Sequence, residues 1–263
     1  MADQAPKFLF AGDRDVAVGV LVSLLESGDR PAALLLPDED RASHDDALVE
    51  LCGGPGISPV VIRARHLHQP ASLEFLRTLE LDYIVSVHFP HIIKSPVLGT
   101  AKHGALNLHP AYLPYNRGWH TPTWAILDGT PAGASLHYMS ESLDAGDVVY
   151  QEQLPADPDD TAHTLYQKLK SLEVRVFREG WQRIREGRRE GTPQAGEVAT
   201  THRRRDLFDP AVQRIDLDGV FRAADLLRRL RALTTSRLDE AAYFESGDRR
   251  YRVQITITPD GAA

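Results

Sequence analysis

Short apolar runs alternate with longer stretches of helical period through the first part of the chain, and this alternation constrains the fold more than any other feature. The runs are too short for helices and are free of polar alternation, which is typical of strands buried on both faces. They cover residues 8–11, 32–36, 60–62, 83–87 and 105–108. Residues 16–25 and 73–79 carry apolar side chains at helical spacing. Repeated strand, helix and strand predict an α/β fold with a Rossmann-like parallel sheet that helices cover on both faces.

The same pattern continues to residue 186. Residues 134–139 and 148–154 predict two more strands. Asp160 stands where a helix N-cap belongs, ahead of a helix predicted over Ala162–Arg185. We therefore assign residues 1–186 to one domain.

The composition changes after residue 186. Residues 187–206 are rich in Gly, Thr, Pro and charge, which predicts a linker. In the remaining segment, 207–263, residues 220–233 predict an amphipathic helix, and residues 242–245 and 250–257 flank a Ser-Gly-Asp turn that predicts a β-hairpin. This small C-terminal subdomain can hold little core of its own, so we expect it to dock on the first domain or on a second subunit.

Charge and terminal sequence exclude several classes of function. The formal net charge of −7 disfavours a nucleic-acid partner, and we interpret the arginines within residues 183–189 and 203–205 as a solvated helix face and a linker. The N-terminal residues show no long apolar segment and no basic flank, so we predict neither a signal peptide nor a membrane span, and a cytoplasmic protein. No metal is expected, because His66 and His68 have a suitable spacing but lack a third ligand. Cys52, the one cysteine, is interpreted as a small buried hydrophobe.

The segment LNLHPAYLPYNRG, residues 106–118, carries the strongest chemical signal. Asn107 and His109 lie two residues apart on a predicted strand, so their side chains share one face, and Pro110 ends the regular structure. Asp144, in the later segment SLDAGD, is a third candidate for the same spot. Amide, imidazole and carboxylate in convergence suit acyl transfer, in which an oxyanion needs a donor and a nucleophile loses a proton. The role of Asp144 stays open among favouring the protonated imidazole, orienting it and relaying a proton through water.

With these elements in order, the chain resembles the folate-dependent formyltransferase superfamily, which includes methionyl-tRNA formyltransferase, and it is most similar to the sugar N-formyltransferases. The resemblance runs from FLFAG to the closing YFESGDRRYRV and is carried most specifically by NLHPAYLPYNRG and HYMSESLDAGDVV. It implies that residues 1–186 form the catalytic domain and that Asn107, His109 and Asp144 are the catalytic residues. It further implies 10-formyltetrahydrofolate as the donor, held mainly by backbone groups of two loops. The residues of those loops are His88, Phe89, His91, Ile92, Ser140, Glu141 and Asp144.

The acceptor is expected to be a primary amine on a nucleotide-linked amino sugar, carried by dTDP or UDP. The segment YNRGWHTPTWAILDGT resembles the sugar enzymes, whereas a tRNA enzyme is expected to carry a full C-terminal barrel and a less acidic chain. The candidates for the acceptor side are Tyr112, Asn116, Arg117, Trp119, His120 and Trp124. Arg117 suits a phosphate or carboxylate because guanidinium pairs with both in a forked geometry. His137 is expected to support the site, and Arg228, Arg229 and Arg231 either hold the nucleotide or cover a helix face.

Two other functions stay open on the sequence. One keeps formyl transfer and changes the acceptor to an amine of a natural-product or peptide intermediate without a nucleotide. The other is a folate-binding protein without catalysis, which the complete set of Asn107, His109 and Asp144 disfavours. A homodimer through the C-terminal helix and hairpin is consistent with the exposed edge that such a hairpin presents.

Overall fold

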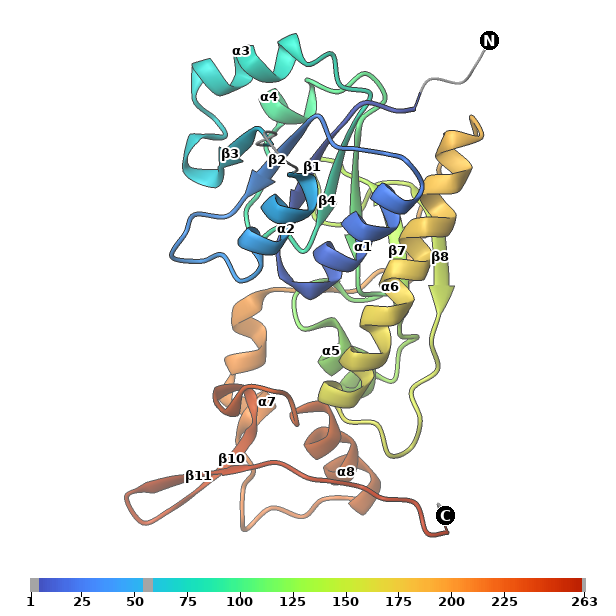
Figure 1. The fold of residues 1–263 in the computed structure, drawn as a ribbon. Coiled ribbons are helices and arrows are strands. Elements are labelled where there is room, and N and C mark those ends of the chain that lie inside the picture. The colour runs from blue at the N-terminus through green and yellow to red at the C-terminus, as the bar shows by residue number, and fades with distance from the viewer. Residues whose placement is uncertain (1–4, 54–58, 262–263) are drawn as a thin grey trace. The chain divides into compact units, whose positions relative to one another are not determined.

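A computed structural model describes residues 5–53 and 59–261 of the chain, shown as a ribbon in Figure 1. The chain divides into two compact units. Unit 1 comprises Met1–His109, Ser135–Gln151 and Glu173–Gln194, and unit 2 comprises Pro110–Ala134, Glu152–Leu172 and Ala195–Ala263. The two units therefore interleave along the sequence, and the boundaries predicted at residues 186 and 206 stay a prediction.

The centre of unit 1 is a seven-stranded sheet with the strand order β3-β2-β1-β4-β5-β7-β8. Its strands are β1 Phe8–Gly12, β2 Ala33–Leu36, β3 Val61–Arg63, β4 Tyr83–Val87, β5 Ala105–His109, β7 Gly133–Tyr138 and β8 Val148–Gln153. Neighbouring strands from β3 to β5 pair in parallel. The seven strands predicted for this sheet all form, within one residue of the expected ends, whereas the second strand of the tail hairpin, predicted over residues 250–257, ends at Val253.

Strand β7 departs from the purely parallel sheet that the sequence predicts, because it pairs with β5 in the antiparallel direction. The chain leaves unit 1 after His109 and returns at Ser135, and these two residues lie opposite each other in the register. The connection through unit 2 thus brings the chain back to the edge at which β5 ended, so β7 has to run the other way. The sheet is mostly parallel.

Helices cover both faces of this sheet, as the sequence predicts. They are α1 Arg14–Glu26, α2 Asp45–Cys52, α3 Pro70–Thr78, α4 Ser95–Leu98 and α6 Ala162–Arg185. On one face, Leu9 of β1 belongs to a buried cluster that includes Leu76 of α3 and Val97 of α4. On the other face, Phe8 of β1 packs edge-on against Trp181 of α6, with ring centroids 5.2 Å apart. Alternate side chains of one strand therefore enter two separate cores, which explains why the runs read as continuously apolar.

The N-cap of α6 lies one residue later than predicted. The helix begins at Ala162, and the Oγ1 atom of Thr161 accepts a hydrogen bond from the backbone N–H of Thr164 at 3.3 Å. The Asp160 carboxylate is used elsewhere, since it accepts hydrogen bonds from the Thr164 hydroxyl and the Lys168 ammonium.

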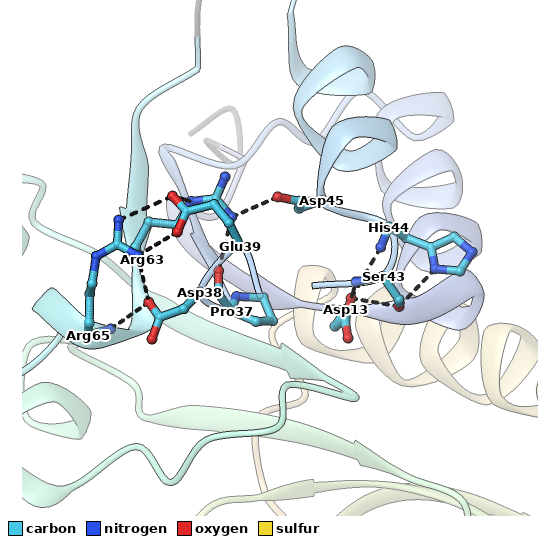
Figure 2. Close-up of polar contacts among 9 residues, drawn as sticks. All are labelled: Asp13, Pro37, Asp38, Glu39, Ser43, His44, Asp45, Arg63 and Arg65. Carbon is cyan, nitrogen blue, oxygen red and sulfur yellow. Dashed lines mark hydrogen bonds and ion pairs between the residues drawn. The ribbon is translucent and has the colours of Figure 1, made fainter. Parts of the chain in front are cut away.

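Side chains close the loops at the carboxyl ends of β1, β2 and β3, as Figure 2 shows. Asp13 follows β1, is 4 % exposed, and accepts hydrogen bonds from the backbone N–H groups of Ser43 and His44 and from the Ser43 hydroxyl. Arg63, at the end of β3, donates to Asp45 at 2.8 Å and to the Pro37 carbonyl oxygen. The Asp13 carboxylate thus holds the loop of residues 43–44 beside the turn after β1.

Unit 2 contains the remaining elements, including the predicted tail helix and hairpin. They are β6 Arg117–Gly118, α5 Thr121–Asp128, β9 Thr201–His202, α7 Pro210–Gln213, α8 Ala223–Ala232, β10 Ala242–Ser246 and β11 Arg249–Val253. Strand β9 lies within the segment predicted as a linker and pairs in parallel with β6. Leu207, Leu233 and Ala242 form a small buried cluster, so the tail contributes a core of its own.

Short 3-10 helices complete the fold. They cover Ala64–His66, Gly196–Val198, Arg204–Phe208 and Leu238–Glu240. Within the part of the chain that the structure describes, no helix is both long enough and apolar enough to span a bilayer.

Candidate active site

Asn107 and His109 lie on β5, in the interior of the sheet of unit 1. The strand pairs with β4 on one side and β7 on the other, and Asn107 stands opposite His137 of β7 in the register. Because the two residues are two positions apart on a strand, both side chains project from the same face. His109 is the last residue of β5, and Pro110 follows it, as the sequence predicts.

Asp144 reaches the same spot from the loop between β7 and β8. Its Oδ1 atom lies 3.4 Å from Asn107 Nδ2, and its Oδ2 atom lies 3.6 Å from His109 Nε2. Asp144 has a φ of 49°, in the left-handed region that aspartate tolerates better than most residues. Gln194 fixes this loop by donating hydrogen bonds to the carbonyl oxygens of Asp144 and Gly146 at 2.9 and 2.7 Å. The three predicted side chains therefore converge.

His137 supports this group from the neighbouring strand. Its Nδ1 atom lies 2.8 Å from the Tyr138 carbonyl oxygen, which can only accept, so Nδ1 carries a proton. In the neutral ring Nε2 then accepts, and it lies 3.3 Å from Asn107 Nδ2. His137 is 1 % exposed, so its ring cannot swing into solvent. The two acceptors beside Nδ2, His137 and Asp144, fix which end of the Asn107 amide faces them.

The geometry suits stabilisation of a developing negative charge together with transfer of a proton. His109 and Asp144 side chains are only 7 % and 11 % exposed, and hydrogen bonds in such an environment are stronger than in water. Both contacts of the Asn107 amide exceed the usual length of about 2.9 Å, so one N–H can be redirected to a stronger acceptor without a large loss.

The two loops predicted to hold the donor also belong to unit 1, and the loop after β7 contacts α4, the helix that follows the loop after β4. Glu141 Oε1 accepts a hydrogen bond from the hydroxyl of Ser95, the first residue of α4, at 3.1 Å. The Ser140 hydroxyl donates to the Ser142 carbonyl oxygen within its own loop. This places the residues after β4 beside those after β7, which is the arrangement that a ligand held by both loops requires.

The loop after β4 combines buried polar atoms with an exposed apolar side chain. His88 has a φ of 53°, and its Nε2 atom lies 2.6 Å from the carboxyl group of Glu173 on α6. The rings of Phe89 and His91 lie 5.3 Å apart, and His91 Nε2 is buried without a hydrogen-bond partner. Ile92 is 79 % exposed. An orphaned buried donor or acceptor beside an open apolar surface fits a ligand that carries polar and apolar groups.

Two residues predicted for the acceptor side are engaged inside unit 2. Asn116 is 1 % exposed, its Nδ2 atom donates to the Thr130 hydroxyl at 2.9 Å, and its backbone N–H donates to the Thr200 hydroxyl. Trp124 is stacked on the ring of His202 with centroids 4.0 Å apart. These contacts assign both side chains to the packing of unit 2.

The other predicted acceptor residues are Tyr112, Arg117, Trp119 and His120. Trp119 is the most accessible of them at 42 % exposure, and the Arg204 guanidinium lies 5.7 Å from its ring centroid. His120 caps the start of α5 in a left-handed conformation, and its Nδ1 atom lies 3.7 Å from Glu240. Burial lowers the pKa of His120, an effect that the Glu240 carboxylate partly opposes.

The tail arginines differ in what they contact. Arg229 donates to the carbonyl oxygens of Ala211, Val212 and Arg214, which makes it part of the packing. Arg231 likewise donates to the carbonyl oxygens of Asp160 and Asp157, and Arg228 pairs with Asp225 at 2.7 Å. Both arginines line a cavity of about 750 Å³ within unit 2, whose other walls are mainly aliphatic. A cavity of this size accommodates a small organic ligand.

Sequence reasoning missed Glu173, Gln194 and Ser95, which hold the two loops through hydrogen bonds. Glu173 left a signal, because it is an acidic residue within the apolar stripe of a long helix. Gln194 left none, since it lies in the segment predicted as a linker. Of the residues that the structure describes, no group of three or more His, Cys, Asp or Glu side chains is arranged to hold a metal ion. Cys52 is partly exposed rather than buried as predicted, and the burial that it has raises the pKa of its thiol to about 11.

The chain matches two protein families and several known proteins. A family described as formyl transferase matches residues 29–180, and one described as N-formyltransferase dimerization C-terminal domain matches residues 208–259. A methionyl-tRNA formyltransferase from Myxococcus xanthus is 31 % identical over 236 residues, covering 87 % of this chain and 73 % of that protein. The chain spans less than two thirds of several other methionyl-tRNA formyltransferases that it matches.

Solved structures share the fold at lower identity. A 4-N formyltransferase from Francisella tularensis superposes with a TM-score of 0.80 at 19 % identity, over 97 % of this chain and 98 % of that one. An N-formyltransferase from Helicobacter canadensis, solved with folinic acid and dTDP-3-aminofucose, gives a TM-score of 0.65 at 20 % identity, over 87 % and 81 % of the two chains.

Proposed function

This chain belongs to the formyl transferase family, and from that premise we propose that it moves the formyl group of 10-formyltetrahydrofolate to the primary amine of a nucleotide-linked amino sugar. As a member of the family it is a formyl-transfer enzyme. The observation that carries the proposal is the convergence of Asn107, His109 and Asp144 beside the two linked loops.

Each of the three side chains has a separate task in this proposal. When bound, the donor supplies the formyl carbon, and its N10 atom ends with the proton that the amine loses. Asn107 turns one N–H toward the formyl oxygen, and such a donor contributes about 3–4 kcal/mol to the transition state. His109 takes the proton from the attacking amine and returns it to the departing nitrogen. Asp144 stabilises the charged imidazole between these two transfers.

The donor is proposed to lie across the loops after β4 and β7. Ser140 and Glu141 close one side, and the exposed Ile92 with the orphaned His91 nitrogen offers apolar and polar contacts on the other. The Helicobacter canadensis protein and others of this fold were solved with folates, which supports the same donor here.

The amino-sugar acceptor is supported by the fold neighbours and by the segment that follows His109. One neighbour is described as a sugar N-formyltransferase and another as a likely sugar N-formyltransferase, and both match this chain over nearly its whole length. Trp119 is exposed enough to stack on a sugar or a base, and Arg117 precedes it on β6. Arg228 lines the cavity of unit 2 with a half-exposed side chain and suits a phosphate group of the nucleotide.

A second candidate acceptor is an aminoacyl-tRNA, because the relative at 31 % identity is a methionyl-tRNA formyltransferase. The formal net charge of −7 opposes binding of a polyanion. We therefore rank an aminoacyl-tRNA below a nucleotide-linked amino sugar as the proposed acceptor.

A panel assay tests the acceptor. Purified protein and 10-formyltetrahydrofolate are incubated with dTDP-, UDP- and GDP-linked amino sugars, with charged tRNA and with free amines that carry no nucleotide, and formylated product is identified by mass spectrometry. We expect one nucleotide sugar to be formylated, the N107A and H109A variants to be inactive, and W119A to raise the acceptor KM. Formylation of tRNA alone would overturn the sugar assignment, and formylation of free amines alone would favour an acceptor without a nucleotide.

We also propose that the chain forms a homodimer through its C-terminal region. Residues 208–259 match a family described as a dimerization domain, and the hairpin of β10 and β11 carries a stacked pair, Phe244 and Tyr251, with Tyr251 42 % exposed. Analytical ultracentrifugation of the wild type and Y251D checks the homodimer. A monomeric wild type would contradict the proposal.

A further inference from the structure

A buried ion-pairing contact joins the long helix α6 to the end of β4. His88 Nε2 and Glu173 Oε1 lie 2.6 Å apart, and the two side chains are 7 % and 0 % exposed. We propose that Glu173 is a positioning residue, which acts through His88 to fix the loop of residues 88–92 for the formyl donor. This inference rests on the proposed function, because it assigns that loop to the donor.

The position of Glu173 argues against a role in stability alone. It lies in the buried stripe of α6 between Leu172 and Val176, where an apolar residue would be expected. Its Oε2 atom has no hydrogen-bond partner, so the carboxyl group is only half satisfied. A buried, half-satisfied carboxyl group contributes less to stability than an apolar side chain of similar volume. A contact that stability does not require is a candidate for a role in function.

His88 connects this contact to the site. The register of β4 and β5 ends with Val87 opposite Leu108, so the next residues, His88 and His109, follow side by side where the two strands end. His88 adopts a φ of 53°, which is uncommon for a residue other than glycine and is sterically unfavourable. As a carboxylate, Glu173 accepts a hydrogen bond from His88 Nε2–H.

The consequence is that the direction of the loop depends on Glu173. A left-handed residue reverses the chain immediately after β4 and sets where Phe89 to Ile92 begin. Without its partner, His88 is free to return to the ordinary right-handed or extended region, and the backbone groups after it would turn with it. A loop that binds through backbone groups then loses affinity even though no contacting side chain has changed.

Binding of folinic acid, a stable donor analogue, tests this without knowledge of the acceptor. E173M replaces the carboxyl group by an apolar side chain of similar size, and we expect its dissociation constant to rise about tenfold with the melting temperature kept or raised. E173Q keeps an oxygen that accepts from His88, and we expect it to bind within about threefold of the wild type.

Asp29 provides a matched control in the same unit. Asp29 is 1 % exposed, its Oδ2 atom accepts a hydrogen bond from Trp181 Nε1 at 2.8 Å, and its Oδ1 atom has no hydrogen-bond partner. D29N therefore removes a carboxylate that is as buried as that of Glu173, is half satisfied and also contacts α6. We expect D29N to change the melting temperature and leave folinic acid binding unchanged. If E173M does not fold, H88L combined with E173M removes both polar partners, and it should show the same tenfold loss because leucine disfavours a φ of 53°.

The outcomes separate this inference from the proposed function. Equal binding by the wild type and E173M, or equal losses in E173M and D29N, would overturn the positioning role and leave the donor assignment intact. A wild type that binds no folinic acid would overturn the donor assignment, and the positioning role with it. Loss of folinic acid affinity in E173M, with affinity retained in E173Q, supports both the positioning role of Glu173 and the donor assignment.

Discussion

Replacing Asp144 with asparagine separates the charge of the carboxylate from its shape. Asparagine has nearly the same volume and accepts a φ of 49° at least as readily as aspartate, so the loop conformation is kept. Its amide oxygen can still accept from Asn107. The change therefore removes mainly the negative charge that faces His109.

The size of the effect follows from the distance between the two groups. At 3.6 Å and an effective dielectric constant near 20, a carboxylate and an imidazolium attract each other by about 4–5 kcal/mol. The asparagine dipole retains part of this stabilisation, so we expect the transition state to lose about 3 kcal/mol, which lowers kcat roughly a hundredfold. The KM for the donor should change little, because the charge acts on the transferred proton rather than on binding.

The assay follows formylated product at saturating donor and acceptor for wild type, D144N and the control D147N. Asp147 belongs to the same loop but is exposed, so D147N removes an equal charge that solvent screens. We expect D147N to keep wild-type kcat. A D144N enzyme with more than about a third of wild-type kcat, or a D147N enzyme that loses as much as D144N, would refute the assignment of a local electrostatic role to Asp144.

Three further predictions concern the loop, the core and pH. In G146A an added Cβ atom would lie 1.9 Å from the Tyr138 carbonyl oxygen, so the loop that carries Asp144 must move. We expect kcat to fall at least about tenfold in a folded protein, and an unchanged kcat would contradict this. W181A should lower the free energy of unfolding by about 3–5 kcal/mol, because the ring is 3 % exposed, and urea titration that finds less than about 1 kcal/mol would contradict it. Burial lowers the pKa of His120 below its ordinary value of 6.5, so the unfolded chain takes up the proton first and stability is lost as pH falls through 6.5. The H120N variant tolerates the same φ and should reduce the drop in unfolding free energy between about pH 7.5 and 5.5. An unchanged drop in H120N would count against this role of His120.

Local pattern was sufficient for the strands and for the meeting of Asn107 with His109. Runs such as residues 8–11 are apolar at every position, and only a strand between two covered faces buries them all. The two-residue spacing on a strand fixes a common face whatever the rest of the chain does. The α6 helix was predicted with the observed bounds because its apolar stripe and its charged face leave no other period.

Contacts between distant segments were beyond that reasoning. Which side of a buried histidine meets which carboxyl group depends on how α6 lies against β4, so the pairing of His88 with Glu173 across 85 positions leaves only the trace of an acidic residue in an apolar stripe. The burial of Asn116 and Trp124 likewise depends on Thr130, Thr200 and His202, which approach only when β6 and β9 pair. A motif names residues without saying which of them face inward.

The sequence by itself therefore determined the α/β class, the succession of strands and helices along the chain and the identity of the amide, imidazole and carboxyl groups, because periodicity and spacing are properties of adjacent residues. Tertiary structure alone decided that β7 runs antiparallel, that the chain forms two interleaved units, and that Gln194 and Glu173 hold the loops around the site. Those features arise from hydrogen bonds and packing between segments far apart in the chain, and such contacts exist only after the chain has folded.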